Sequence, residues 1–286
     1  MKNNSKRQKI VILGHTGFLG SCLYENFSKE IGHEVYGFSS ADINLSLPKE
    51  CRKLLNVIDK KSIVIMAAAS LIKSRDFTSF RNDLNMLSNL AEILLLVGAK
   101  HLIYISSVAI YGRRSDLVIT ELSQSKPDDF YSLSKVWGEL ILNRICFDSG
   151  IPLTILRPGT IYGRNDIRSP FFRFLSRIRG DKEVEIYGDG SSKLFWVHKM
   201  DLYRIFQSVI TGRKFGDYNI VAEGDGISLL KLAELMFGVC GRENSIKFIP
   251  SKKNPVNLRF DTSKFKLCFP EVGFIRLEGG LKEYLD

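Results

Sequence analysis

Three polar residues in this 286-residue chain, Ser107, Tyr131 and Lys135, have the types and spacing needed for acid–base chemistry at a substrate oxygen. Tyr131 and Lys135 are four residues apart in a segment predicted to be helical, so their side chains share one face. The Tyr-x-x-x-Lys spacing alone is weak evidence for a catalytic pair. Its position 24 residues after Ser107 strengthens that evidence. Because a nearby ammonium favours an ionised phenol, we expect Tyr131 to exchange a proton with a substrate hydroxyl or carbonyl. Lys135 would favour the phenolate form of Tyr131, and Ser107 would hydrogen-bond the same substrate oxygen.

A glycine-rich turn near the N-terminus predicts a phosphate-binding loop. Gly14 and Gly17 lie between a predicted strand and a predicted helix, and Gly20 falls in the first turn of that helix, in a unit of 30 residues from Lys9 to Phe38. Such glycines let the backbone turn tightly and approach a pyrophosphate, whose charge then lies at the helix N-terminus. We therefore expect a dinucleotide here, with Lys135 and Tyr131 at its nicotinamide end. The loop residues expected to contact it are Gly14, Thr16, Gly17, Phe18, Leu19 and Gly20.

The end of the second predicted strand bears on the kind of dinucleotide. Ser39 and Ser40 stand where an acidic residue commonly binds the ribose hydroxyls of NAD. Two hydroxyls without a carboxylate favour the 2′-phosphate of NADP(H), although no arginine lies beside them and NAD(H) remains possible. Asp42, slightly further on, is expected either to accept a hydrogen bond from the adenine amino group or to cap the next element.

The first half of the chain alternates apolar runs with helical segments, a pattern typical of a doubly wound parallel sheet in an α/β protein. The predicted strands are Lys9–Leu13, Glu34–Phe38, Ser62–Met66, His101–Ile105 and Leu153–Leu156. The predicted helices are Phe18–Lys29, Pro48–Asp59, Ser79–Val97 and Phe130–Ser149.

After Arg157 and Pro158 the elements become shorter and glycine more frequent, which predicts a smaller α+β lobe. Helices are expected there near Asp201–Ile210 and Leu229–Phe237. We expect a dinucleotide-binding domain over residues 1–158 and a substrate-binding lobe over residues 159–286, with some returns of the chain between them.

Composition limits the possible functions. The apolar fraction is 44%, which fits a packed globular chain, and no apolar run approaches the ~18 residues needed to cross a bilayer. The short apolar segment near the N-terminus is no secretory core, so we expect a cytoplasmic protein. The five cysteines are too far apart for a disulfide framework or a zinc site, and we expect no metal. The net charge of +10 fits a phosphorylated ligand, and no nucleic-acid motif accompanies it.

The segment Leu84–Val97 is apolar on more than one face. A helix that only covers a sheet needs a single apolar stripe, so the surplus indicates a second buried surface. We expect a homodimer interface made from this helix and the neighbouring helix near Phe130–Ser149, with coverage by the second lobe as the alternative.

Taken together, these motifs resemble the extended short-chain dehydrogenase/reductase family, in its NAD(P)-dependent epimerase/dehydratase branch. The motifs that follow the family's order are the glycine loop, Ala67-Ala68-Ala69 after a strand, Ser106-Ser107-Val108-Ala109-Ile110-Tyr111-Gly112, the Tyr131/Lys135 pair, Arg157-Pro158-Gly159-Thr160-Ile161-Tyr162-Gly163, Gly188-Asp189-Gly190-Ser191, Val197-His198 with Asp201, and Asp261-Thr262-Ser263-Lys264. The resemblance implies a Rossmann domain that holds NAD(P), with Ala67, Ala68, Ala69 and Pro158 among its contacts, and a C-terminal lobe that receives a nucleotide sugar.

Departures from the family pattern narrow the chemistry. The 4,6-dehydratases of this branch carry acidic residues after the catalytic Ser or Thr, where this chain has Val108 and Ala109, and dehydration is therefore disfavoured. The family often has Asn at Thr160 and, at Leu194, an Arg that contacts the diphosphate of the sugar nucleotide. The resemblance therefore implies Thr160 and the neighbouring Lys193 as substrate contacts, with a solvated turn lysine as the alternative for Lys193.

The favoured function is reduction of a 4-keto nucleotide sugar by NADPH, with Tyr131 donating the proton. A nucleotide-sugar 4-epimerase with tightly held NAD would use the same residues. Two more distant alternatives are a family member acting on a lipid or phenolic ketone and a non-catalytic NADP-binding regulator, which would typically lack the tyrosine.

Overall fold

The computed structural model describes residues 7–69, 76–113, 118–167, 169–252 and 254–284. Contacts between residues divide the chain into two compact units. The first comprises Met1–Ile110, Pro127–Arg157 and Ser208–Tyr218, and the second comprises Tyr111–Lys126, Pro158–Gln207 and Asn219–Asp286. A single division after residue 158 would assign residues 111–126 to the first unit and residues 208–218 to the second. Each of these segments belongs to the other unit, because it pairs with segments distant in sequence.

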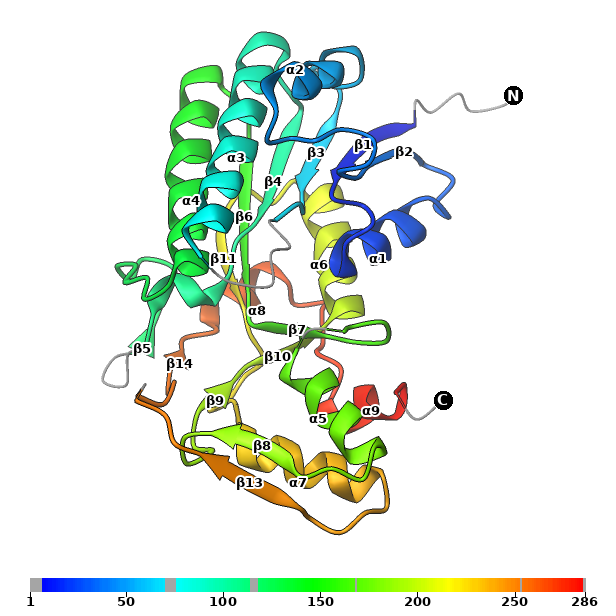
Figure 1. Ribbon diagram of the computed structural model, residues 1–286. Helices are drawn as coiled ribbons and strands as arrows, with labels where there is room; N and C mark the ends of the chain where they lie inside the picture. The colour runs from blue at the N-terminus through cyan, green and yellow to red at the C-terminus, as the bar shows by residue number, and fades with distance from the viewer. Residues whose placement is uncertain (1–6, 70–75, 114–117, 168, 253, 285–286) are drawn as a thin grey trace. The chain divides into compact units, whose positions relative to one another are not determined.

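A central six-stranded sheet forms the core of the first unit (Figure 1). Its strands are β1 (Gln8–Leu13), β2 (His33–Phe38), β3 (Ile63–Met66), β4 (His101–Ile105), β6 (Leu153–Pro158) and β11 (Gly216–Ile220). Their order is β11-β6-β4-β3-β1-β2, and the pairings β1–β2, β1–β3, β3–β4 and β4–β6 are parallel. The five predicted strands are all present, and the predicted doubly wound, Rossmann-like sheet is confirmed.

The strand order creates the position where ligands bind in such sheets. The chain passes from β1 outward to β2 and then returns across β1 to β3, so the direction of winding reverses between β1 and β3. Ligands bind at the carboxyl ends of the strands at such a reversal. The glycine loop follows β1 and the three alanines Ala67, Ala68 and Ala69 follow β3, so the first unit places both segments at this point.

Four helices connect these strands in the described part of the first unit: α1 (Phe18–Phe27), α2 (Pro48–Cys51), α3 (Phe77–Val97) and α4 (Phe130–Ser149). The helix expected over residues 48–59 is instead the four-residue α2 followed by the 3₁₀ helix η1 (Arg52–Asn56). Cys51 and Leu54 are both buried. Cys51 ends α2 and Leu54 lies in η1, so both short helices contribute a side chain to the core beneath the sheet-covering segment.

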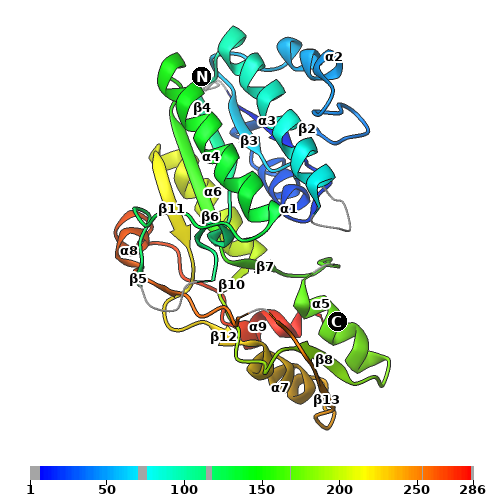
Figure 2. The same cartoon turned by 60° about the vertical axis from the view of Figure 1, so that its left-hand side comes forward.

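Helices α3 and α4 lie side by side over one face of the sheet (Figures 1 and 2). Leu87, Leu90 and Leu94 of α3 and Leu142 of α4 share a core cluster with buried residues of β1, β3, β4 and β6. Gly138 lets α4 approach closely, because a Cβ there would lie 2.3 Å from the Tyr104 hydroxyl oxygen.

The second unit is an α+β lobe of short strand pairs and helices, as expected from the sequence. Its strand pairs are β5 (Val118–Ile119) with β14 (Arg259–Phe260), β7 (Thr160–Tyr162) with β10 (Trp196–His198), β8 (Val184–Tyr187) with β13 (Ile246–Ile249), and β9 (Lys193–Leu194) with β12 (Ile227–Ser228). Its helices are α5 (Pro170–Arg179), α7 (Leu229–Val239), α8 (Ser263–Cys268) and α9 (Leu277–Lys282), while α6 (Lys199–Gly212) runs from the second unit into the first. Within the described ranges, no helix combines the length and apolar character needed to cross a membrane.

Candidate active site

The glycine loop has the backbone geometry that close approach to a phosphate requires. Gly14 has φ of +93°, and a Cβ at this position would lie 2.7 Å from the Ala68 nitrogen. A Cβ on Gly20 would lie 2.0 Å from the Gly14 carbonyl oxygen, so α1 can pack against the loop only with glycine there. The N-cap of α1 is Gly17, which supplies no capping side chain, and the first turn carries no acidic residue. An anion is the complement of such a helix end.

The end of β2 holds a carboxylate that the sequence analysis had not placed there. Asp42 accepts hydrogen bonds from the backbone nitrogen of Ser39 at 2.8 Å and from its hydroxyl at 2.7 Å. These hydrogen bonds lower the pKa of Asp42. The Ser39 hydroxyl is therefore engaged by a negative charge, whereas Ser40 is exposed.

The start of α4 fixes the position of Tyr131. Asp129 is the N-cap and accepts a hydrogen bond from the Ser132 nitrogen at 2.7 Å, while the Ser132 hydroxyl accepts one from the Asp129 nitrogen at 3.1 Å. This reciprocal pair is a capping box, which defines the first helical turn. Tyr131 and Lys135 then lie on one helix face, as their spacing indicates.

Lys135 is the best-defined member of the predicted catalytic set. Its side chain is buried, and its ammonium donates to the carbonyl of Ile105, the last residue of β4, at 2.8 Å. The same ammonium lies 5.8 Å from the ring centroid of Tyr131 and 5.2 Å from that of Tyr104. Ser107, two residues beyond Ile105, is also buried, and its hydroxyl oxygen accepts a hydrogen bond from the Ala109 nitrogen at 3.1 Å. The first unit thus brings the Tyr131/Lys135 face of α4 to the loop that carries Ser107.

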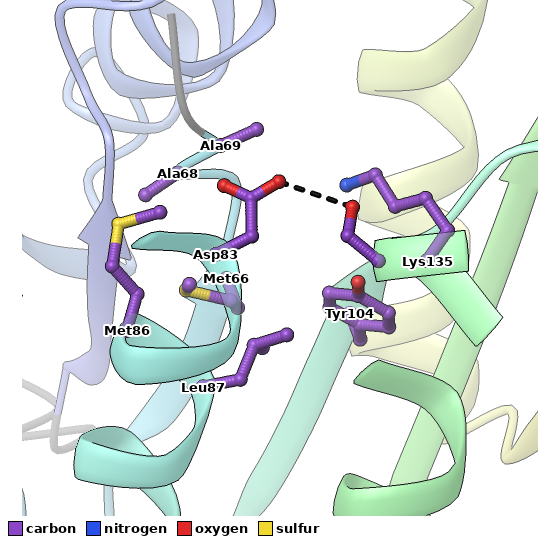
Figure 3. Close-up of a pocket in the computed structure, with 9 residues that line it drawn as sticks. Met66, Ala68, Ala69, Asp83, Met86, Leu87, Tyr104 and Lys135 are labelled. Atoms are coloured by element: carbon purple, nitrogen blue, oxygen red, sulfur yellow. Dashed lines mark hydrogen bonds between the residues drawn. The ribbon is translucent and has the colours of Figure 1, made fainter. Parts of the chain in front are cut away.

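Ala68 and Ala69, which were predicted to contact the cofactor, line a small cavity together with Lys135 (Figure 3). Its volume is about 10 Å³, roughly the space of one water molecule. Asp83 of α3 and Tyr104 of β4 also line it, and the Asp83 carboxylate accepts a hydrogen bond from the Ser134 hydroxyl at 3.0 Å. The sequence analysis singled out neither Asp83 nor Ser134, although Ser134 immediately precedes Lys135.

A buried ionic cluster lies next to these residues and was also missed. Arg157 donates to the two carboxylate oxygens of Glu139 at 2.9 and 2.7 Å, and to Asp217 at 2.7 Å. Glu139 also accepts a hydrogen bond from the Ser106 hydroxyl at 2.5 Å. Two features of the sequence could have indicated this cluster: Glu139 follows Lys135 by four residues, and Ser106 is adjacent to Ser107.

The second unit contains the predicted substrate contacts and a separate pocket of about 290 Å³. Leu194 lines this pocket, as do residues at 162, 195–196, 222–223, 225–227 and 274–277. Lys193 forms an ion pair with Asp225, a lining residue, at 3.6 Å. Thr160 lies in β7, two residues before the lining residue Tyr162, and Pro158 ends β6. Arg276 supplies the pocket with a cationic side chain that the sequence analysis did not identify.

Comparison with known proteins places this arrangement in a family. The sequence model of the NAD dependent epimerase/dehydratase family matches residues 10–221, which covers most of the first unit and about half of the second. Among curated proteins, a dTDP-4-dehydro-6-deoxy-D-allose reductase from Streptomyces sp is 29% identical over 176 residues, or 58% of this chain and 54% of that protein. A reductase of the same name from Streptomyces bikiniensis is 31% identical over 44% of this chain and 40% of that protein. The chain thus aligns with about half the length of these relatives.

Solved structures share the fold over nearly the whole chain. The UDP-glucuronic acid 4-epimerase from Bacillus cereus, in complex with NAD, superposes with a TM-score of 0.84 at 24% identity and covers 96% of each chain. The UDP-glucose 4-epimerase from Thermotoga maritima, with UDP-glucose, gives a TM-score of 0.82 at 21% identity over 96% of each chain. At such identities the likeness establishes the fold.

Proposed function

The chain belongs to the NAD dependent epimerase/dehydratase family, and from that premise we propose that it reduces the 4-keto group of a nucleotide sugar. Two of the curated relatives are reductases of dTDP-4-dehydro-6-deoxy-D-allose, which supports this choice. A keto sugar joined to a nucleoside diphosphate is the proposed substrate class.

The proposed mechanism assigns one role to each residue of the set. Tyr131 donates its hydroxyl proton to the ketone oxygen, and Ser107 donates a hydrogen bond to the same oxygen. Lys135, whose buried ammonium lies 5.8 Å from the Tyr131 ring centroid, stabilises the phenolate that remains. A bound nicotinamide supplies the hydride that adds to the ketone carbon. The uncapped N-terminus of α1 and the glycine packing at Gly14 and Gly20 fit its pyrophosphate.

The observation that carries the proposal is the apolar pair after Ser107. Val108 and Ala109 begin the 3₁₀ helix η2 (Val108–Tyr111), and the Ala109 nitrogen binds the Ser107 hydroxyl oxygen. Elimination of water from a sugar requires groups that remove and return protons, and neither side chain can do so. Redox chemistry at a single carbon needs no such groups: with a nicotinamide to exchange the hydride, Ser107, Tyr131 and Lys135 would supply the proton transfer and the hydrogen bonds.

The direct experiment is oxidation of NADPH or NADH at 340 nm with dTDP-4-dehydro-6-deoxy sugars, comparing the wild-type protein with Tyr131→Phe. We expect kcat to fall by at least ~100-fold in the variant while cofactor affinity is kept. Tyr187→Phe, at an exposed tyrosine in β8, is the matched control. Equal activity in wild type and Tyr131→Phe contradicts the mechanism, and binding of NADP without turnover of any keto sugar favours the regulator.

A nucleotide-sugar 4-epimerase is the second candidate, and the end of β2 favours it. The Asp42 carboxylate, which engages the Ser39 hydroxyl, opposes a 2′-phosphate and suits the ribose diol of NAD, the cofactor that an epimerase retains through its cycle. This contact counts against the NADP(H) preference expected from Ser39 and Ser40. Release of bound nucleotide from the purified protein, followed by incubation with UDP-glucose and UDP-glucuronic acid, tests the candidate: retained NAD and a 4-epimer product support it.

The pocket of the second unit is the proposed site for the nucleotide of the substrate. Trp196 and Phe274 give it aromatic walls, and Arg276 is the lining residue proposed to bind the diphosphate. Two carboxylates also line the pocket, and each has a cationic partner: Glu223 pairs with Lys266 at 2.8 Å and Asp225 with Lys193 at 3.6 Å. Lys193 is proposed to contact the substrate after exchanging its ion pair with Asp225, and Thr160 is proposed as a further contact.

We also propose a homodimer through the outer faces of α3 and α4. Leu96 of α3 is 70% exposed, and Leu140 and Phe147 of α4 are 61% and 82% exposed. Trp137, three residues before Leu140 on α4, is also exposed. Large exposed apolar residues gathered on adjacent helices mark an interaction surface, and a second copy supplies a surface of the same kind. A cytoplasmic location stays a prediction.

A further inference from the structure

The buried cluster around Glu139 connects three chain segments of the first unit. Glu139 and Arg157 are 7% and 6% exposed, and Arg157 binds both oxygens of the Glu139 carboxylate. The carboxylate also receives the Ser106 hydroxyl at 2.5 Å. Two nitrogen atoms of Arg157 and the hydroxyl of Ser106 therefore all donate to the Glu139 side chain of α4.

Two of these segments, the loop of Ser106 and helix α4, carry residues of the proposed reaction. Ser106 is the neighbour of Ser107, and its backbone nitrogen is held by the Leu156 carbonyl at 2.8 Å. Glu139 is one helical turn beyond Lys135 and two turns beyond Tyr131 on the same face of α4. The Ser106–Glu139 hydrogen bond thus ties the loop carrying Ser107 to the helix face that carries the proton donor.

We propose that Glu139 is a positioning residue, which fixes Ser107 relative to Tyr131 and Lys135 by holding Ser106. The inference rests on the proposed redox function. A hydrogen bond from a hydroxyl to a carboxylate is short and strong, and Arg157 orients this carboxylate by binding both of its oxygens. Buried ion pairs contribute little net stability, and apolar side chains of similar size often replace them without loss. Apolar side chains could not hold Ser106 by a hydrogen bond. The placement of Ser107 is therefore a function that this polar cluster has and an apolar replacement lacks.

Ser106 allows the link to be broken without disturbing the ion pair. Ser106→Ala removes the hydroxyl and leaves Glu139 bound to Arg157, whereas Ser106→Thr keeps a hydroxyl. Glu139→Gln removes the charge from the other end. Asp217→Asn is the matched control, because Asp217 binds Arg157 at 2.7 Å but lies outside the Ser106–Glu139 link.

Two measurements test the proposal. With a 4-keto nucleotide sugar as substrate, Ser106→Ala and Glu139→Gln should each lower kcat by roughly tenfold to a hundredfold with little change in KM. Ser106→Thr should restore most of the rate and Asp217→Asn should keep it. In a Ser107→Ala background, Ser106→Ala should have almost no further effect, since it acts through Ser107. Independently of activity, hydrogen–deuterium exchange in peptides covering residues 105–110 should quicken in Ser106→Ala and Glu139→Gln and stay unchanged in Asp217→Asn.

The two readouts separate the failure of this inference from failure of the proposed function. A wild-type protein that reduces no keto sugar contradicts the proposed function, while faster exchange in Ser106→Ala would still support the holding role of Glu139. Unchanged exchange in Ser106→Ala overturns the inference whatever the activity. An unchanged kcat in Ser106→Ala, or effects of Ser106→Ala and Ser107→Ala that simply add, also overturns it. If Glu139→Gln does not fold, Ser106→Ala with its Thr rescue decides the question.

Discussion

Ser39 at the end of β2 donates both its backbone nitrogen and its hydroxyl to one carboxylate oxygen of Asp42, at 2.8 and 2.7 Å. The Asp42 carboxylate therefore lies beside the Ser39 hydroxyl, which was expected from the sequence to bind a 2′-phosphate. Because the hydrogen bonds from Ser39 lower the pKa of Asp42, the charge is present throughout the neutral range.

We predict from this contact that Asp42 governs the choice between NAD and NADP. We expect Asp42→Asn to improve the affinity for NADPH relative to NADH by roughly five- to tenfold, since removal of the charge relieves repulsion of the 2′-phosphate. The ratio of dissociation constants from fluorescence titration measures the effect. Asp189→Asn is the control, because Asp189 accepts the same pair of hydrogen bonds from Ser191 in the second unit. An unchanged ratio in Asp42→Asn would show that Asp42 has no part in the discrimination.

Gly20 tests the phosphate-binding loop through its packing. A Cβ at this position would lie 2.0 Å from the Gly14 carbonyl oxygen, so Gly20→Ala must displace α1 from the loop. We expect this variant to lose cofactor-induced thermal stabilisation. At Gly238 in α7 a Cβ meets nothing within 4 Å, and Gly238→Ala should keep that response while raising stability by about 0.5–1 kcal/mol. A normal thermal shift with NADH and NADPH in Gly20→Ala would contradict the assigned loop.

The outer face of α4 should decide the oligomeric state. Leu140→Glu combined with Phe147→Glu should convert a dimer into monomers, because two charges would be buried without partners at the interface. Light scattering after size-exclusion chromatography measures the mass directly. The matched control is Leu267→Glu, at a position in α8 that is 82% exposed, as Phe147 is. A monomeric wild type, or a dimer that survives both substitutions, would exclude this interface.

His101 gives the fold a defined pH dependence. Its ring nitrogen Nε2 lies 2.8 Å from the Thr154 hydroxyl oxygen, and that hydroxyl donates to the Lys214 carbonyl, so the neutral ring donates through Nε2. Burial, with smaller contributions from the charges of Lys100 and Arg213, lowers the pKa of His101 from 6.5 to about 4. The unfolded chain then binds a proton more readily than the folded one between these values.

The contribution of His101 to stability is therefore complete above pH 6.5 and is lost as the pH falls toward 4. The loss is at most about 3 kcal/mol. Urea unfolding of the wild type and His101→Gln at several pH values measures it, and we expect a flatter profile over this range in the variant. Parallel profiles of unfolding free energy against pH in the wild type and His101→Gln would show that folding does not hold the His101 ring neutral.

Local pattern was sufficient for much of the fold. The predicted strands at β1, β2, β3, β4 and β6 are present because alternating apolar runs and helical segments leave a parallel sheet as the stable way to bury them. Helix α4 spans the predicted residues, since its N-cap Asp129 and its C-cap Gly150 are local signals. The shared face of Tyr131 and Lys135 follows from helical periodicity alone.

Residues that are neighbours in the chain form the glycine loop, the Tyr131/Lys135 face and the apolar pair after Ser107, so local sequence was enough to predict these features. Which distant groups meet them depends on how the chain folds. Glu139 lies 33 positions from Ser106 and 18 from Arg157, and no periodicity predicts that α4, β4 and β6 bring them together. The pocket of the second unit likewise draws its walls from four separated segments. Such contacts depend on strand order and on the depth at which helices pack, which are properties of the whole folded chain.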